Sequence, residues 1–168
     1  MTTGRDPGRA GPGPSACTVQ VVAQPDGNPP DKAADVEAVR EANRSFYAAF
    51  EARDLDAMSD LWAHDAEVTC VHPGWVTLRG WGQVAASWAA LFDGPQRLQF
   101  IVTDDAVVVA GDVAWVTCDE NLLGDEGGAT VAVLNLFARD PEGRWRMLAH
   151  HGSPVMGRSI AAEDADDR

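Results

Sequence analysis

The sequence predicts an α+β fold in which the helices of an N-terminal half cover a curved antiparallel sheet. Apolar residues recur at helical spacing until about residue 92, and they alternate with a period of two from residue 97 onward. Short turns rich in Gly, Asp and Pro separate the later segments, as in antiparallel hairpins. Helices followed by a meander of strands are typical of α+β layers.

The folded unit is predicted to span residues 33–157. Residues 1–32 contain five Gly and six Pro and few large apolar side chains, so they cannot bury enough surface to offset the entropy of ordering. We therefore expect a disordered extension there. Residues 158–168 are rich in Ala and acidic side chains and are predicted to form a solvated tail.

Three helices are predicted. The first runs over residues 33–52 and carries Phe46 and Phe50 on one apolar stripe. Asp54 is a plausible N-cap for a short second helix. The third helix is predicted over residues 80–92, between a Gly at its start and an Asp-Gly-Pro stop.

Five strands are predicted after the second helix. A short one at residues 67–71 ends at a Pro-Gly corner, and the four long ones read apolar on alternate residues. The long strands are expected at residues 97–109, 113–123, 129–139 and 145–155.

Composition excludes several functional classes. The chain has 13 Lys and Arg against 26 Asp and Glu, a net charge of −13, which disfavours nucleic acid and anionic membrane surfaces as partners. No apolar run approaches the roughly 18 residues of a membrane span. Three widely spaced cysteines form no CxxC pair, so we expect reduced thiols in a cytoplasmic protein.

Three motifs carry a family resemblance. FYAAFEARDLDAMSDLWAHDAEV at residues 46–68, HPG at 72–74 and LRGWGQV at 78–84 resemble the nuclear transport factor 2-like superfamily, in its SnoaL-like and ketosteroid-isomerase-related branch. The resemblance implies a cone-shaped half barrel whose three helices close a pocket. It also implies a homodimer formed through the outer face of the sheet, a small apolar partner molecule and no cofactor. The fold hosts isomerases, cyclases, hydrolases and binding subunits, so it does not name a reaction.

The chain departs from the isomerase pattern at three positions. The isomerases' oxyanion-hole tyrosine falls on Phe46, their general-base aspartate on Cys70 and their protonated aspartate on Asn135. Tyr47 is one residue further along the helix, which turns it about 100° away. An Asn amide still donates a hydrogen bond, whereas the phenol and the base are missing. The usual steroid isomerase route is therefore not expected.

Histidines are the alternative proton carriers. His72 lies two residues after Cys70 on the same face of its strand, and it either acts as a base or orients the Pro73-Gly74 corner. The adjacent His150 and His151 point to opposite faces; the isomerase alignment favours His150 inward, and alternation with Trp145 and Met147 favours His151.

A polar run interrupts the second long strand. Strand parity that turns Trp115 into the pocket also turns Asp119 and Asn121 inward, and it leaves Glu120 facing outward, toward a dimer contact. A buried carboxylate needs a partner, so Asp119 is either paired with a histidine in the pocket or placed where the strand emerges into solvent.

The remaining candidates are ligand contacts. Trp75 at the corner and Trp88 on the third helix could form an aromatic wall, although the helical spacing of Trp88 also suits a core residue. Cys70 in mid-strand suits a small buried hydrophobe better than a nucleophile. His72, His150 and a carboxylate could make a metal face, but no pair has ligand spacing, and we expect no metal.

Two functional hypotheses follow. The first is a cofactor-independent acid–base enzyme, of isomerase, cyclase or hydratase type, acting on a small apolar or polyketide-like substrate. Its proton carriers would be His72 with Asp119 or His150, and its oxyanion donor Asn135. The second is a non-catalytic ligand-binding or dimerisation module of the same fold. Histidines outside the pocket would exclude the enzyme.

Overall fold

The computed structural model describes residues 32–95, 97–124 and 127–156. The predictions for the N-terminal extension and the acidic tail lie outside these residues, apart from Lys32, which begins the first helix. The described residues form three helices and one six-stranded sheet, so the α+β prediction is confirmed.

The helices lie close to their predicted positions. They are α1 (Lys32–Ala52), α2 (Leu55–Leu61) and α3 (Trp81–Asp93). Asp54 is the N-cap of α2, and its Oδ1 accepts a hydrogen bond of 2.9 Å from the backbone N–H of Ala57. None of the described helices has the length and hydropathy of a membrane span.

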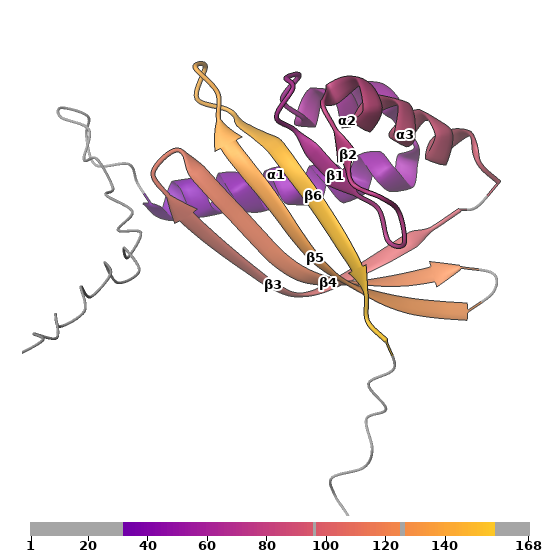
Figure 1. Cartoon of the computed structure of the whole chain (residues 1–168). Helices are drawn as coiled ribbons and strands as arrows, with labels where there is room; N and C mark the ends of the chain where they lie inside the picture. The colour runs from indigo at the N-terminus through magenta and orange to yellow at the C-terminus, as the bar shows by residue number, and fades with distance from the viewer. Residues whose placement is uncertain (1–31, 96, 125–126, 157–168) are drawn as a thin grey trace, which may run out of the picture.

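The sheet is curved and does not close into a barrel (Figure 1). Its order is β2-β1-β6-β5-β4-β3, and all neighbours are antiparallel except β1 and β6, which are parallel. The sequence prediction missed β2, a two-residue strand at the edge of the sheet that pairs with β1 and with no other described strand. The strands are β1 (Thr69–Val71), β2 (Leu78–Arg79), β3 (Gln99–Ala110), β4 (Val113–Gly124), β5 (Gly127–Arg139) and β6 (Trp145–Pro154).

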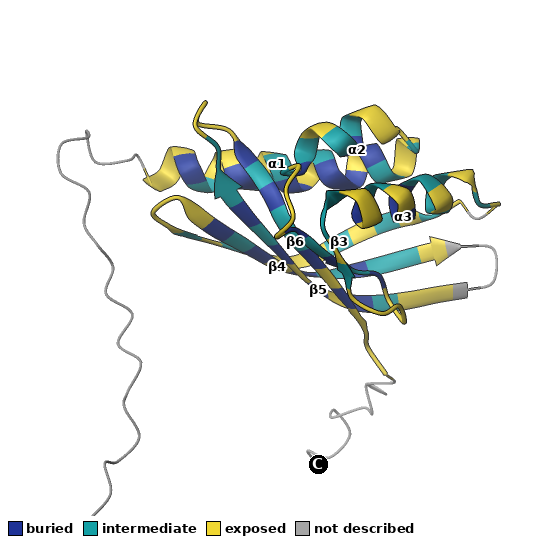
Figure 2. Ribbon diagram, turned by 45° about the horizontal axis from the view of Figure 1, so that its top comes forward, coloured by how far each residue is buried: buried dark blue, intermediate teal, exposed yellow. Residues whose placement is uncertain are grey.

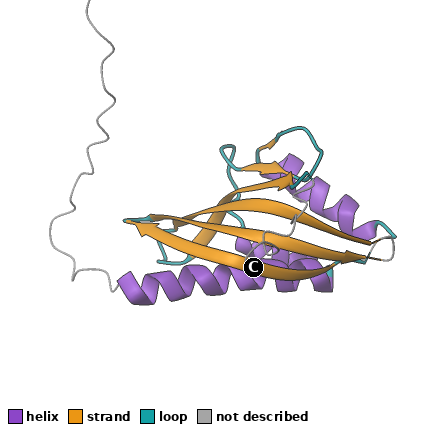
Figure 3. Cartoon of the chain, turned by 90° about the horizontal axis from the view of Figure 1, so that it is seen from below, coloured by secondary structure: helices purple, strands orange, loops and turns teal. Residues whose placement is uncertain are grey.

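All three helices pack on one side of the sheet. Helix α1 runs along the long strands, while α2 and α3 lie near β1 and β2 (Figures 1 and 3). The faces that α1 and the sheet turn toward each other are buried, and the opposite face of the sheet is largely exposed (Figure 2). We call these two sides of the sheet the interior face and the outer face.

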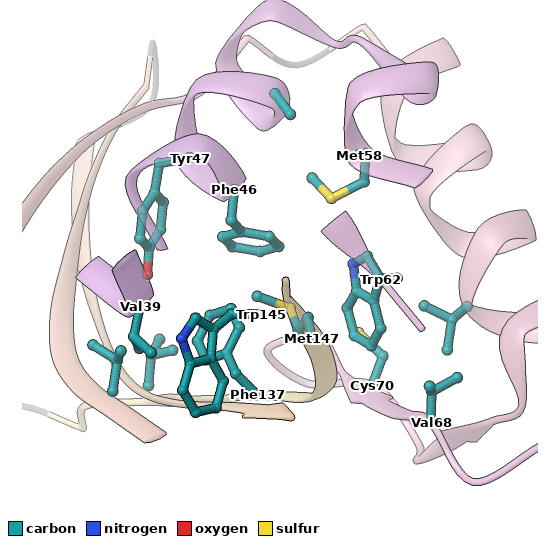
Figure 4. Close-up of a cluster of buried hydrophobic side chains, with 14 of the residues drawn as sticks. Val39, Phe46, Tyr47, Met58, Trp62, Val68, Cys70, Phe137, Trp145 and Met147 are labelled. Carbon is teal, nitrogen blue, oxygen red and sulfur yellow. The ribbon is translucent and has the colours of Figure 1, made fainter. Parts of the chain in front are cut away.

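The core lies between α1 and the interior face. Phe46 is at its centre, with Tyr47 beside it and Met58 and Trp62 from the α2 region on the other side (Figure 4). Met147 of β6 comes from the sheet below. This packing places the polar residues of the interior face among aromatic rings and away from water.

Candidate functional site

Strand parity in β4 is opposite to the prediction. Ala114, Val116, Cys118 and Glu120 are buried under the helices, so Trp115, Asp119 and Asn121 belong to the outer face. The prediction that these three line the pocket was wrong. The prediction placed the large Trp115 in the interior. The sheet instead buries its smaller neighbours Ala114 and Val116.

Glu120 is therefore the carboxyl group of the interior, not Asp119. Its side chain is 4% exposed, and the prediction that it faces outward was wrong. Tyr47 Oη donates a 2.8 Å hydrogen bond to Glu120 Oε1 and lies 3.3 Å from Cys118 Sγ. Because the phenol proton goes to Glu120, the Cys118 thiol is the donor to the phenol oxygen. Glu120 Oε2 has no hydrogen-bond partner among the described residues.

Burial dominates the ionisation of this cluster. It raises the pKa of Glu120 to about 7, and the hydrogen bond from Tyr47 only partly opposes this. Burial, followed by the charge of Glu120, raises the pKa of Tyr47 well above its ordinary value. Burial also raises the pKa of Cys118 to about 11. Among these three groups, Glu120 alone changes its charge near neutral pH.

Tyr47 was not among the predicted site residues. The 100° turn from Phe46 was expected to point it away, yet both residues are buried. The buried face of α1 is wide enough to hold both, with ring centroids 5.1 Å apart. One sequence signal could have found the cluster. Glu120 lies on the same face of its strand as the apolar Val116 and Cys118, which predicts that it is buried with them.

A β-bulge decides which histidine of β6 faces the interior. The register shifts between Leu136 and Phe137, whose partners are Ala149 and Met147, so Leu148 is an extra residue on β6. The extra residue reverses the parity set by Met147 and turns His150 inward, where it is 4% exposed. His151 is exposed on the outer face, so its expected pocket contact was wrong.

His150 belongs to a hydrogen-bonded chain that fixes its tautomer. Asn135 Nδ2 donates to Asn43 Oδ1 at 2.8 Å, which turns Asn135 Oδ1 toward His150 Nδ1 at 2.7 Å. A carbonyl oxygen only accepts, so Nδ1 carries the proton and Nε2 carries the lone pair. His150 Nε2 has no hydrogen-bond partner within the described ranges. Burial, followed by the nearby His72, lowers the pKa of His150 to about 3.

His72 is held in the other tautomer. Ser87 Oγ donates its proton to the carbonyl of Val84 at 2.7 Å, so at 2.9 Å it accepts from His72 Nε2. The lone pair is then on Nδ1, which lies 3.8 Å from Cys70 Sγ. Burial lowers the pKa of His72 to about 4. The backbone of His72 also serves the corner, since its carbonyl accepts from the N–H of Trp75 at 2.9 Å.

Aromatic rings surround both imidazoles. The rings of His72 and His150 have centroids 6.3 Å apart, and Trp88 lies 4.6 Å from the first and 6.0 Å from the second. Phe46 lies 5.1 Å from His150. Trp88 is fully buried, and its Nε1 has no hydrogen-bond partner in the described part of the chain. Trp75 is 46% exposed at the corner and packs edge-on against His72.

The structure therefore divides the predicted site residues into two groups. Those on the interior side are Phe46, Cys70, His72, Trp88, Asn135 and His150, with Trp75 at the rim. Those on the outer face are Trp115, Asp119, Asn121 and His151. We call the residues His72, His150, Asn135, Tyr47 and Glu120 the interior site.

The outer face contains a shallow hollow of about 540 Å³. Asp119, His151 and Leu134 all line it, so the predicted Asp–His pair shares the outer face and not the interior. Asn121 is satisfied nearby by Thr103 and Thr130, at 3.1 Å and 3.0 Å.

Metal ligation has no support in the described residues. No three His, Cys, Asp or Glu side chains within residues 32–95, 97–124 and 127–156 come together as a set that could hold an ion. The interior site instead offers neutral imidazoles, an amide, a phenol and a carboxyl group, which are the components of proton transfer and oxygen binding.

A curated relative and two solved structures are similar to this chain. The F-box protein SKIP8 of Arabidopsis thaliana is 31% identical over 123 residues, which are 73% of this chain and 52% of SKIP8. The chain thus spans about half the length of the curated relative that it matches.

The first solved structure is a candidate dehydratase of the NTF2-like family from Streptomyces avermitilis. It is 42% identical, covers 74% of this chain and 99% of its own, and superposes with a TM-score of 0.69. The second is a candidate calcium/calmodulin-dependent protein kinase type II association domain from Thiobacillus denitrificans. It is 38% identical, covers 70% of this chain and 94% of its own, and has a TM-score of 0.60.

A family profile described as the SnoaL-like domain matches residues 39–157, which include α1 from its eighth residue onward and every later helix and strand. The resemblance expected from the sequence motifs is confirmed by this match and by the NTF2-like structural neighbours. The chain belongs to the SnoaL-like domain family of the NTF2-like superfamily.

Proposed function

We propose that this protein is a cofactor-independent acid–base enzyme of the lyase or isomerase type, acting on a small, uncharged and largely apolar molecule in the interior site. One observation carries the proposal. Two buried neutral imidazoles lie with ring centroids 6.3 Å apart among aromatic side chains, and each has one nitrogen fixed by a hydrogen bond and a lone pair on the other.

His150 Nε2 carries a lone pair that would accept a proton from a bound substrate, and the lowered pKa of about 3 makes the resulting imidazolium a strong acid that readily gives the proton up again. Its Nε2 would take a proton from the carbon next to a carbonyl group, and the Asn135 carbonyl oxygen would stabilise the resulting imidazolium through Nδ1. The imidazolium would return the proton to a hydroxyl group on the next carbon. The C–O bond then breaks, water leaves and an α,β-unsaturated carbonyl compound remains. Returned to carbon instead, the same proton gives an isomer.

The similarity to a candidate dehydratase at 42% identity favours the first outcome. The substrate is expected to be uncharged because, within the described part of the chain, the buried polar groups include no Lys or Arg. The buried Asp35 has its own cation, Arg139, at 2.5 Å. An anionic ligand would therefore have no counter-charge there, and it would meet Glu120.

The test compares two adjacent histidines. His150→Gln and His151→Gln would be assayed on a panel of cyclic β-hydroxy ketones, by the ultraviolet absorbance of the unsaturated product. We expect kcat/KM to fall about 100-fold or more for His150→Gln and to stay unchanged for the exposed control. A folded His150→Gln protein with full activity would contradict the proposal. Turnover of no panel member, with no ligand bound, would also contradict it.

The outer face favours a second function, self-association. Exposed apolar residues gather on it, including Ile101, Val108 and Leu134, which are 53%, 41% and 43% exposed. The similarity to a candidate association domain points the same way. We propose a homodimer formed through this face. Leu134→Asp should halve the mass measured by sedimentation, whereas a mass that is unchanged by the substitution would refute this face as the contact.

A further inference from the structure

We propose that Trp88 binds the leaving hydroxyl group of the substrate, by donating a hydrogen bond from its indole Nε1 to the hydroxyl oxygen. This rests on the proposed function and adds a specificity to it. A hydroxyl oxygen has lone pairs that accept such a bond, whereas an ammonium group has none. The substrate class is therefore an alcohol and not an amine.

The first observation is a buried donor without a partner. Trp88 is fully buried on α3, and its Nε1 has no hydrogen-bond partner within the part of the chain that the structure describes. A buried N–H of this kind costs free energy, and native proteins contain few of them. An indole nitrogen donates and does not accept, so the missing partner is an acceptor atom.

The rings around Trp88 do not supply that acceptor. Phe46 and Phe50 are nearly perpendicular to the indole, at interplanar angles of 77° and 86°, with ring centroids 5.5 Å away in both cases. Their faces are weak acceptors compared with an oxygen lone pair. The imidazole of His72, 4.6 Å away, directs its Nε2 proton to Ser87 Oγ. The partner that would complete the hydrogen bonding of Trp88 is therefore an atom of a ligand.

The second observation is the distance from Trp88 to the proposed base. The ring centroids of Trp88 and His150 are 6.0 Å apart. Two hydrogen bonds that meet at one oxygen span about 5 to 6 Å, since each N···O distance is about 2.9 Å. An oxygen held by Trp88 Nε1 would therefore be within reach of a proton on His150 Nε2.

The third observation is the arrangement of α3. Ser87 and Trp88 are adjacent and both buried, and Ser87 holds His72 by a 2.9 Å hydrogen bond. The indole lies beside both imidazoles, 4.6 Å from His72 and 6.0 Å from His150. One turn of α3 thus brings an N–H donor to the part of the interior where the proposed proton transfer takes place.

The hydrogen bond would assist the elimination of water. As the C–O bond breaks, its electron pair goes to the hydroxyl oxygen, which takes the proton from the His150 imidazolium and leaves as water. A fixed N–H donor stabilises the negative charge that develops on this oxygen before the proton arrives. Trp88 transfers no proton itself.

The experiment compares two probes, 1-indanol and indane, which share a flat apolar ring system and differ by one hydroxyl group. Their affinities for the full chain would be measured from ¹H–¹⁵N spectra recorded during titration. The affinity for 1-indanol divided by that for indane isolates the contribution of the hydroxyl group. This ratio should fall about tenfold in Trp88→Phe, which keeps an aromatic ring and removes the donor.

Trp145→Phe is the matched control. Trp145 is also buried in the core with an Nε1 that has no partner among the described residues (Figure 4). It lies on β6 five residues before His150, about 16 Å away along the strand at roughly 3.3 Å per residue. Its indole is too far from the imidazoles to share a ligand oxygen with them, so the ratio should not change in this variant.

A second measurement needs no substitution. The indole N–H signal of Trp88 in the wild type should move downfield when 1-indanol binds, because a hydrogen bond deshields the proton. Indane controls for the effect of the ligand's ring and should move this signal less. The indole signal of Trp145 should respond to neither probe.

The two proposals fail in different ways. The role of Trp88 alone is overturned by a ratio that stays the same in Trp88→Phe or falls equally in Trp145→Phe, and by a Trp88 signal that responds equally to both probes. Binding of 1-aminoindane, an ammonium ion at neutral pH, as tight as that of 1-indanol overturns the specificity for alcohols. Binding of no probe overturns the interior site as a whole, and with it the proposed function.

Discussion

Glu120→Gln should make the protein more stable above neutral pH. The substitution keeps the shape of the side chain and an oxygen that accepts the Tyr47 hydrogen bond, but it removes the charge. Burial raises the pKa of Glu120 from 4.5 to about 7. The folded state therefore holds the proton more tightly than the unfolded state does. The stability due to this group is fully present below pH 4.5 and is lost as the pH rises through 7.

The size of the effect follows from the two pKa values. At roughly 1.4 kcal/mol per pKa unit, the ionised carboxylate costs about 3 kcal/mol of the free energy of unfolding once the pH exceeds 7. The two interior imidazoles act in the opposite direction, since their pKa values are lowered and their contribution is lost as the pH falls below 6.5. They are the same in both proteins and cancel from the difference.

Urea unfolding at pH 5, 6, 7 and 8 measures that difference. The advantage of Glu120→Gln over the wild type should grow by about 2 to 3 kcal/mol from pH 5 to pH 8. Asp119→Asn controls for the loss of one negative charge and should show no comparable growth, because its side chain is on the outer face. An advantage of Glu120→Gln that is the same at pH 5 and pH 8 would refute the burial argument.

Three other substitutions test the packing around the site. Phe46→Ala should lower the free energy of unfolding by about 3 to 5 kcal/mol, measured by urea titration, because Phe46 is 1% exposed at the centre of the core. Asn43→Ala should cost about 1 to 3 kcal/mol, because it leaves Asn135 Nδ2 unpaired, and it should alter the ¹⁵N shifts of His150. Gly152→Ala should cost about 1 to 3 kcal/mol, visible as a lower Tm, because a Cβ there would lie 3.1 Å from the Pro73 side chain.

The order and bounds of the larger elements were predictable because each rests on a local pattern. Helical spacing around Phe46, the side-chain cap at Asp54 and the turns between the long strands act within a few residues of one another. Strand β2 was missed for the same reason: two residues carry no period, and Leu78–Arg79 is a strand only because β1 lies beside it.

It was harder to predict which face of the sheet each polar side chain lies on, because this depends on the register between paired strands. In β6 the extra residue Leu148 reverses the alternation, and nothing in the local sequence marks the bulge. In β4 the choice between Asp119 and Glu120 is made by Tyr47, which is 73 positions away from Glu120 in the chain. Alternation with a period of two divides the residues of a strand into two sets but does not show which set is buried. Contacts with another element determine that.

This dependence on distant partners explains why a position-by-position comparison with ketosteroid isomerases understates the chemistry of the interior. At the aligned positions the chain has Phe46 and Cys70, which lack the phenol and the carboxylate. One residue along the same helix, however, Tyr47 supplies a phenol, and a different strand brings Glu120 to it at 2.8 Å.

A helix turns about 100° per residue, and a strand reverses its face at every residue. When one functional group of a pair shifts by one position in the sequence, the two groups stay together only if the other group shifts as well. Here both have moved, and the lone pair of His150, which an adjacent bulge turns inward, faces the same aromatic wall. The interior therefore holds a phenol–carboxyl pair and an imidazole with an unpaired ring nitrogen, although neither lies at the position that the isomerase comparison indicates.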